Sequence, residues 1–267
     1  MANIPKFIED QKLIKFSEKD HKYLLNGREC ISVTTFIKEY FAQRFDESGA
    51  ILSKCAIKEG VSEKQLKKRW ENKRDRAGLF GKNLHSNLEY FIKTGKIKQN
   101  KFAAAIKYFK DNYKFDGDLY AEALLFNESL LISGTCDLIS IKDNIATVSD
   151  FKSNAKGIST YSFGKYMKYP LSTIPDAPFY HYQLQISIYL YLLCSKYGYI
   201  PSNDNCIFWL DRKKNEFKRI PVEYRQEDVI NCFSHYTYIK SLSKEQLEEL
   251  NKSKIIVPEN NEEVWID

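Results

Sequence analysis

Two aspartates and a lysine combine side-chain types with a spacing that could support chemistry. The dipeptide Asp143-Asn144 favours a two-residue turn between two β-strands. Counting outward from this turn places Asp137 directly opposite Asp150. Cβ atoms of opposed residues are about 4.5–5.5 Å apart, so the two carboxylates would repel and raise each other's pKa. A divalent cation is the expected compensating charge, and oxygen ligands favour Mg²⁺ or Mn²⁺.

Lys152 lies two residues beyond Asp150 and is expected on the same face of the sheet. An ammonium group beside a metal site can orient water and stabilise negative charge on a phosphate. The alternative is a solvent-facing Asp–Lys pair on an edge strand, because Asp-x-Lys is common by chance. The segment Gly-Thr-Cys-Asp at 134–137, at hairpin spacing from the lysine, favours the chemical interpretation.

Two pairs at helical spacing could complete such a site. His85 and Glu89 are four residues apart and share one helix face. A neutral imidazole could bind the metal, with Glu89 as a direct or indirect partner; the alternative is a surface pair. Gln185 and Tyr189 have the same spacing within an apolar helix. They either reach the metal site or a phosphate, or the glutamine is incidental in a core helix.

The elements that must position these residues alternate between helix and strand patterns. Strands are expected over 13–16, 23–25, 30–33, in three segments within 119–152, and over 206–210 and 216–222. Helices are expected near 34–42, 62–76, 82–93, 101–113, 182–197 and 227–241, with a loop over 154–180. Ser62 is the expected N-cap of the second helix, Gly78 and Gly81 are expected to interrupt or bend the chain, and Gly95 is the expected C-cap of the third. This order predicts an α/β fold with a mixed sheet.

The helix expected over 62–76 is strongly basic. One interpretation is a solvated helix face, and the other is a surface that follows phosphates, with Trp70 stacking on a base. The basic residues are Lys64, Lys67, Lys68, Arg69, Lys73, Arg74 and Arg76.

Composition indicates a soluble globular protein. Of the 267 residues, 43% are hydrophobic and 28% charged, and the net charge of +6 mildly favours a polyanionic partner. The sequence shows neither a signal peptide nor a membrane-spanning stretch, so a cytoplasmic protein without membrane contact is expected. The 6 cysteines form no Cys-x-x-Cys pair and are expected to be free thiols, with no zinc or iron–sulfur site.

Five ordered elements resemble the PD-(D/E)XK nuclease superfamily, in particular its RecB-like and phage exonuclease branches. The matching segments are Gly81–Glu89, Glu122 in its strand, Gly134–Asp137, Asp150–Lys152 and Gln185–Tyr189. The resemblance implies an α/β fold with a restriction-endonuclease-like core, in which a central mixed β-sheet is flanked by helices. The whole chain, 1–267, would be a single nuclease domain. It would have an N-terminal hairpin and helix appendage (1–60), a catalytic core (74–241) and a peripheral tail (242–267).

The same resemblance implies residue roles. His85, Asp137 and Asp150 would bind the metal together with the backbone carbonyl of Phe151, and Glu89 is a further candidate ligand. Lys152 would be the catalytic lysine. Gln185 and Tyr189 would help to hold the lysine and DNA, and Glu122 matches an upstream glutamate. The candidate nucleic-acid contacts are Lys68, Arg69, Trp70, Lys73, Arg74, Lys165 and Lys168.

The function expected from these residues is a Mg²⁺- or Mn²⁺-dependent DNA exonuclease, acting on single- or double-stranded ends in phage-type recombination or DNA processing. If phage-encoded, it would act in the host cytoplasm, with a recombination or annealing protein as a candidate partner. Three alternatives stay open: an endonuclease on the same site, a catalytically inactive nucleic-acid-binding protein, and RNA as the substrate.

Overall fold

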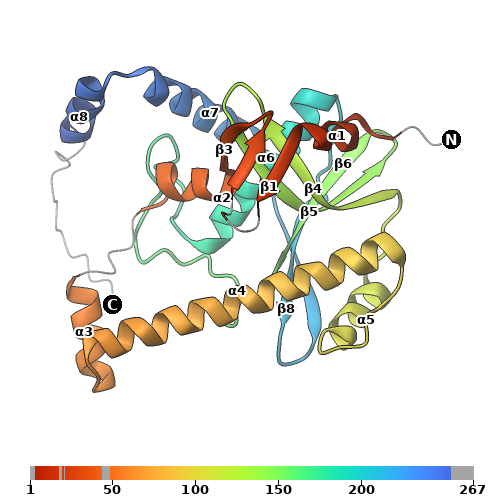
Figure 1. Ribbon diagram of the computed structural model, residues 1–267, viewed down its shortest axis with the longest axis horizontal. Helices are drawn as coiled ribbons and strands as arrows, with labels where there is room; N and C mark the ends of the chain where they lie inside the picture. The colour runs from red at the N-terminus through yellow and green to blue at the C-terminus, as the bar shows by residue number, and fades with distance from the viewer. Residues whose placement is uncertain (1–3, 18–19, 21, 44–48, 254–267) are drawn as a thin grey trace, which may run out of the picture.

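The computed structural model describes residues 4–17, 20, 22–43 and 49–253 (Figure 1). Runs of helices and runs of strands follow one another along this part of the chain. The first elements are α1 (Lys6–Glu9), the 3₁₀ helix η1 (Asp10–Leu13), β1 (Ile14–Ser17), β2 (Lys22–Leu25), β3 (Arg28–Ser32), α2 (Val33–Phe36), the π-helical turn η2 (Ile37–Phe41), α3 (Ala50–Glu59), α4 (Glu63–Thr94) and α5 (Ala103–Asn112). They are followed by β4 (Asp118–Asn127), β5 (Ile132–Lys142), β6 (Ile145–Lys152), α6 (Pro178–Tyr197), β7 (Ile200–Pro201), β8 (Cys206–Asp211), β9 (Glu216–Pro221), α7 (Gln226–Ser241) and α8 (Lys244–Ser253).

The strands form one mixed sheet, which confirms the predicted α/β class. Its order is β1-β2-β3-β5-β6-β8-β9, with β4 paired to β5 and β7 paired to β6. The pairs β3–β5 and β6–β8 are parallel, and the hairpin neighbours are antiparallel. The N-terminal strands therefore continue the central sheet through β3.

The register of the β5–β6 hairpin agrees with the sequence prediction. Pairing runs from Lys142–Ile145 to Leu138–Ser149. Asp143 and Asn144 have φ angles of 48° and 63°, the left-handed values that a type I′ turn requires. Asp137 and Asp150 are the next residues on the two strands.

The edge of β5 that faces β6 is open at one place. β3 pairs with β5 only at Ile132 and Ser133, and β6 pairs with it only from Leu138 onward. Within the described chain, residues 134–137 therefore have no strand partner on this edge. Backbone and side chains at this gap can approach other elements.

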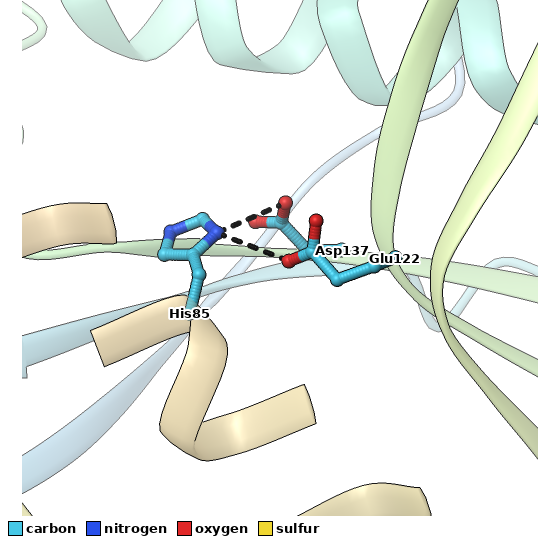
Figure 2. Close-up of side chains that lie close together, drawn as sticks. All are labelled: His85, Glu122 and Asp137. Atoms are coloured by element: carbon cyan, nitrogen blue, oxygen red, sulfur yellow. Dashed lines mark ion pairs between the residues drawn. The ribbon is translucent and has the colours of Figure 1, made fainter. Parts of the chain in front are cut away.

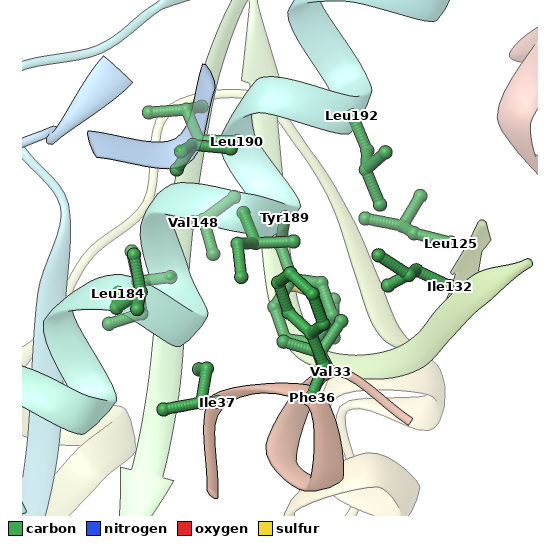
Figure 3. Close-up of a cluster of buried hydrophobic side chains, with 14 of the residues drawn as sticks. Val33, Phe36, Ile37, Leu125, Ile132, Val148, Leu184, Tyr189, Leu190 and Leu192 are labelled. Carbon is green, nitrogen blue, oxygen red and sulfur yellow. The ribbon is translucent and has the colours of Figure 1, made fainter. Parts of the chain in front are cut away.

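Two apolar clusters cover the two faces of the sheet. The larger one joins α6 to α2, α7 and one sheet face, and Figure 3 shows Leu184, Tyr189 and Phe36 within it. The other joins α4 and α5 to the side chains of Leu138, Phe151 and Phe208 among others. Figure 1 shows the long α4 crossing the molecule, with α5 near its C-terminal end and α3 at its N-terminal end.

The prediction that Gly78 and Gly81 break the helical region is wrong. α4 is one helix of 32 residues, capped by a capping box at Ser62 and by left-handed Gly95, as the sequence predicted for these two ends. A glycine in a helix costs only about 1 kcal/mol relative to alanine. Packing at both ends of α4, through Leu66 and through Leu84, offsets this cost.

Three further observations bear on the sequence predictions. The segment between β6 and α6 lacks regular helices and strands, as expected, and α7 lies where a helix was predicted. None of the helices in the described residues is long and apolar enough to cross a lipid bilayer. Of the tail expected to be peripheral, residues 254–267 lie outside the described residues.

Candidate metal centre and active site

Three side chains from three elements converge at the gap in the sheet. His85 of α4 faces Glu122 of β4 and Asp137 of β5, as Figure 2 shows. Its Nδ1 lies 3.3 Å from Asp137 Oδ1 and 3.4 Å from Glu122 Oε1. One ligand atom from each residue lies within 4.8 Å of the others, a spacing at which one ion could contact all three.

The β4 strand is distorted where it carries Glu122. Its neighbours pair regularly with β5, Ala121 with Leu138 and Ala123 with Cys136, so Glu122 lies opposite Asp137. Glu122 has φ 53°, a left-handed conformation that is strained for a residue with a side chain. Residues two apart on a regular strand point to the same face of the sheet. On β5, however, Cys136 and Leu138 are two residues apart but pack in clusters on opposite faces of the sheet. This local distortion turns both carboxylates towards His85.

Asp137 and His85 are both fixed by the backbone of Phe151. Asp137 Oδ2 accepts a hydrogen bond of 2.7 Å from the Phe151 N–H. His85 Nε2 lies 3.0 Å from the Phe151 carbonyl oxygen and donates to it when it carries the proton. This arrangement leaves Nδ1 facing the two carboxylates. The Phe151 carbonyl oxygen lies at the Nε2 edge of the ring, away from the Nδ1 edge that faces the carboxylates, so its role as a metal ligand stays a prediction.

The buried carboxylate of Asp150 forms an ion pair with the partly buried ammonium of Lys152 beside this group. Asp150 is 2% exposed, and its Oδ2 contacts the Lys152 ammonium. Its other oxygen accepts a hydrogen bond of 3.1 Å from Gln185 Nε2. The Lys152 ammonium also lies 4.6 Å from the centroid of the Tyr182 ring. Gln185 therefore orients the carboxylate that holds the lysine.

The site is electrostatically crowded. The pKa of Asp150 is raised to about 7, because burial raises it more than the Lys152 ammonium lowers it, and the Asp137 carboxylate adds to the rise. Burial raises the pKa of Glu122, and the Asp137 carboxylate adds to this effect. Burial lowers the pKa of His85, but Asp137 and Glu122 more than offset it, so the net pKa is well above the usual value. A proton on His85 thus occupies the place where a cation would relieve the same repulsion.

The donor set fits a divalent cation of the Mg²⁺ or Mn²⁺ type. It offers two carboxylates and one imidazole nitrogen. The set that converges in the structure contains Glu122 in the place where the sequence predicted Asp150. Glu122, whose role the sequence left least defined, lies in the group, whereas the oxygens of Asp150 contact Lys152 and Gln185. His85 and Glu122 line a pocket of 580 Å³. Glu89 also lines this pocket, but it forms an ion pair of 2.6 Å with Lys93.

Tyr189 reaches the gap from α6 and packs on a glycine. An ideal Cβ built on Gly134 would lie 2.5 Å from the Tyr189 hydroxyl oxygen, closer than real Cβ contacts. Tyr189 is buried, and burial raises the pKa of its hydroxyl well above the usual value. Glycine at 134 is therefore required for the close approach of this ring, and the ring supports the strand that carries Asp137.

We expect Gly134→Ala to destabilise the fold by about 1–3 kcal/mol, because the added methyl group overpacks a buried contact. Thermal or urea unfolding measures this loss. Adding Tyr189→Phe, which removes the clashing oxygen, should restore part of the stability. A double variant as unstable as the sum of the two single variants would contradict the assigned contact.

The predicted nucleic-acid contacts lie on α4 and in the loop before α6. Arg69 and Lys73 line a groove that also contains Ser153, the residue after Lys152, and Lys68 is exposed on α4. Arg69 forms an ion pair of 3.2 Å with Glu59, and Trp70 packs against the apolar contact between α3 and α4. Exposed Arg74 lies on α4, Lys165 is exposed in the loop before α6, and the Lys168 ammonium lies 3.4 Å from the Glu39 carbonyl oxygen. Trp70 is thus partly buried in the fold, and its stacking on a base stays a prediction.

Sequence reasoning missed two residues that contact this region. Tyr182 packs on the catalytic-lysine candidate, and its position three residues before Gln185 on α6 is a signal that could have identified it. Arg212, in the turn after β8, donates to Ser153, the residue that follows Lys152. No local pattern marked Arg212, because its place depends on the parallel pairing of β6 with β8.

Comparisons with known proteins leave the family of the chain open. No protein-family model and no curated protein sequence matches the chain. Among solved structures, the chain is similar to one described as the crystal structure of SSO0001, with 14% sequence identity and a TM-score of 0.27. The similarity covers 59% of this chain and 66% of that one.

Proposed function

We propose that this protein is a divalent-cation-dependent DNA nuclease that hydrolyses phosphodiester bonds. The observation that carries the proposal is that a group of side chains able to hold a cation lies next to a partly buried lysine. His85, Glu122 and Asp137 converge within 4.8 Å, and Asp150 beside them holds Lys152. The resemblance of five sequence elements to PD-(D/E)XK nucleases supports the same proposal, because these residues belong to those elements.

Three side chains of the protein would bind the cation. These are His85, Glu122 and Asp137. When bound, such a cation supplies Lewis acidity towards a phosphate oxygen and lowers the pKa of water.

Lys152 would act as a cation and hydrogen-bond donor. Burial lowers its pKa, but Asp150 and Asp137 raise it more, so the ammonium stays protonated. A protonated lysine can orient the attacking water and stabilise charge on the phosphate, whereas it cannot accept a proton from water. Gln185 and Tyr182 limit the freedom of this pair through their contacts with Asp150 and with the ammonium.

We expect the affinity for Mg²⁺ or Mn²⁺ to rise as the pH is raised towards the pKa of His85, which lies well above its usual value. In the metal-free protein the raised pKa of His85 keeps the imidazole protonated, so a cation must displace this proton. Titration calorimetry in buffers of different ionisation enthalpy would measure the protons released. An affinity that does not rise with pH below this pKa would show that His85 is not a ligand.

The proposal is tested by digestion of end-labelled linear DNA and covalently closed circular DNA, with Mg²⁺ and with EDTA. Mg²⁺-dependent loss of the linear DNA alone is the result expected of an exonuclease, and the label position gives its polarity. Cleavage of the circle would indicate an endonuclease. Absence of cleavage of either DNA, with Mg²⁺ or Mn²⁺, would overturn the proposal. A matched RNA substrate tests the choice of sugar.

The proposed reaction also implies a cell compartment and a candidate partner protein. It requires the compartment that holds DNA, which is the cytoplasm of a bacterial or phage-infected cell. A protein that anneals the single strands left by digestion is a candidate partner in recombination.

A further inference from the structure

A groove of 910 Å³ lies beside the active site. One wall is the α4 segment that precedes His85, including Lys73 and Arg76, and the other is the loop after Lys152, residues 153–157, with Arg212. The pocket that contains His85 touches the next part of α4, from Gly81 to Glu89. Both hollows therefore follow the same helix in succession.

The charge of the groove is uncompensated. Among the described residues that line it are five cationic side chains and no carboxylate: Arg69, Lys73, Arg76, Lys156 and Arg212. Arg69 is paired with Glu59, but no ion pair within the described chain involves the other four. In a second hollow of 690 Å³, by contrast, the cations face carboxylates, as Arg219 faces Asp204 and Lys142 faces Asp116. Cations gathered without counter-charges repel one another, so the groove favours a polyanionic ligand.

Arg212 is held in place yet incompletely bonded. Its guanidinium carbon lies 3.9 Å from the centroid of the Phe80 ring, and its Nη2 donates to Ser153 Oγ over 3.4 Å. Its Nε is buried without a hydrogen-bond partner in the described chain, a costly state for a charged group. Burial also lowers the pKa of this side chain. A planar guanidinium fixed by stacking suits a phosphate, which could accept from two of its nitrogens.

The loop that lines the groove directly follows Lys152, the catalytic-lysine candidate. Ser153 follows Lys152, and Trp209 Nε1 donates to the Asn154 carbonyl oxygen over 2.9 Å, which fixes the loop against β8. From Arg69 to His85 the helix rises by about 24 Å, at 1.5 Å per residue. A nucleic-acid strand carries one phosphate per roughly 3.4 Å of helix axis. The wall is thus long enough for several consecutive phosphates that lead to the site.

We propose that this groove binds the sugar–phosphate backbone of the substrate strand, with Arg212 as a fixed anchor for one phosphate next to the cleavage site. The choice of a nucleic-acid strand rests on the proposed function. Lys73, Arg76 and Lys156 contact neighbouring phosphates on the same strand. Because the contacts are to phosphates, the groove selects the path of the strand and not its base sequence.

The test is binding of a fluorescently labelled single-stranded oligonucleotide in EDTA, measured by anisotropy over a range of salt concentrations. Each of Arg212→Gln and Arg76→Gln should weaken binding several-fold for any base sequence. Each should also reduce the slope of log affinity against log salt by about 0.7, the value for one phosphate contact on a single strand. The double variant should lose about twice as much slope. Lys110→Gln, an exposed residue on α5 at the other end of α4, is the control of equal charge.

Arg212→Gln could perturb the stacking on Phe80, whereas Arg76 is exposed and its replacement should leave unfolding unchanged. Groove variants that bind like Lys110→Gln, or a wild-type protein that binds no oligonucleotide, would overturn the inference. The anchored phosphate could be an internal diester or a terminal monoester, and oligonucleotides with and without a terminal phosphate distinguish the two. If the groove variants weaken the binding of both oligonucleotides equally, the phosphate is an internal diester. If they weaken only the binding of the phosphorylated oligonucleotide, it is a terminal monoester. Because no cation is present, a failure of cleavage does not affect this result.

Discussion

Lys152→Met is expected to lower the rate of DNA cleavage by about 10²–10⁴-fold, the range for losing one positioned charge or proton-transfer group in an active site. Methionine retains much of the length and packing of lysine, so the change removes mainly the ammonium group. This group is the one cation that contacts the Asp150 carboxylate in the described chain. Cleavage rates at saturating DNA and Mg²⁺, measured with purified wild type and variant, give the ratio.

Lys152→Met should destabilise the fold less than the removal of one partner from a buried ion pair usually does. Removing one partner usually leaves a buried charge unpaired, which costs several kcal/mol. Here the Asp150 carboxyl has a pKa of about 7 because of burial and the nearby Asp137 carboxylate. It can therefore take up a proton near neutral pH and keep the Gln185 hydrogen bond. The variant should bind Mg²⁺ and remain folded while it cleaves slowly.

Lys110→Met is the matched control for this experiment. Lys110 is exposed on α5, away from the residues of the site, so its replacement should leave the rate unchanged. A Lys152→Met protein that is folded and cleaves at the wild-type rate would remove the lysine from the mechanism. Loss of cleavage in the control would show that net charge, and not the position of the lysine, determines the rate.

Local sequence rules predicted the β5–β6 hairpin because its register depends on two residues. Asp143 and Asn144 tolerate positive φ, and the turn they form fixes every pairing up to Leu138–Ser149. The same rules identified both caps of α4, at Ser62 and Gly95. In each case the deciding interaction lies within a few residues along the chain.

The arrangement of the acidic side chains could not be predicted this way. No propensity of glutamate favours the positive φ of Glu122, and its carboxylate lies 3.4 Å from His85, which is distant in sequence. Periodicity placed Asp137 and Asp150 opposite each other, but it could not show that Asp150 faces Lys152 and Gln185 while Asp137 faces His85. These orientations depend on α4 and α6 packing on opposite faces of the sheet.

The groove also depends on distant contacts. Arg212 reaches Ser153 because β8 lies parallel to β6, with Lys152 paired to Trp209. The crossover through α6 that creates this neighbour leaves no mark near Arg212 in the sequence. The continuity of α4 has a similar origin, because packing at its two ends outweighs the propensity of Gly78 and Gly81.

Asp137→Asn is expected to abolish the stabilisation of the protein by Mg²⁺ or Mn²⁺ and to reduce cleavage to background. A ligand at a hundredfold excess over its Kd stabilises the native state by roughly 2.7 kcal/mol. For a domain of this size that corresponds to a rise in Tm of roughly 5–10 °C. The variant removes one of three converging ligands but keeps an oxygen that can accept from the Phe151 N–H. It should therefore fold, and its Tm should no longer respond to the cation.

The control for this variant is Asp118→Asn, an exposed carboxylate at the start of β4. It should keep both the Tm response and the cleavage rate of the wild type. Glu122→Gln separates the ligand set that the structure brings together from the set that the sequence predicted. If Glu122 binds the cation, this variant loses the Tm response as Asp137→Asn does. If Asp150 takes that place instead, Asp150→Asn loses the response and Glu122→Gln keeps it. An unchanged response in all three variants would show that the cation binds elsewhere, because each removes a charge from the same crowded group.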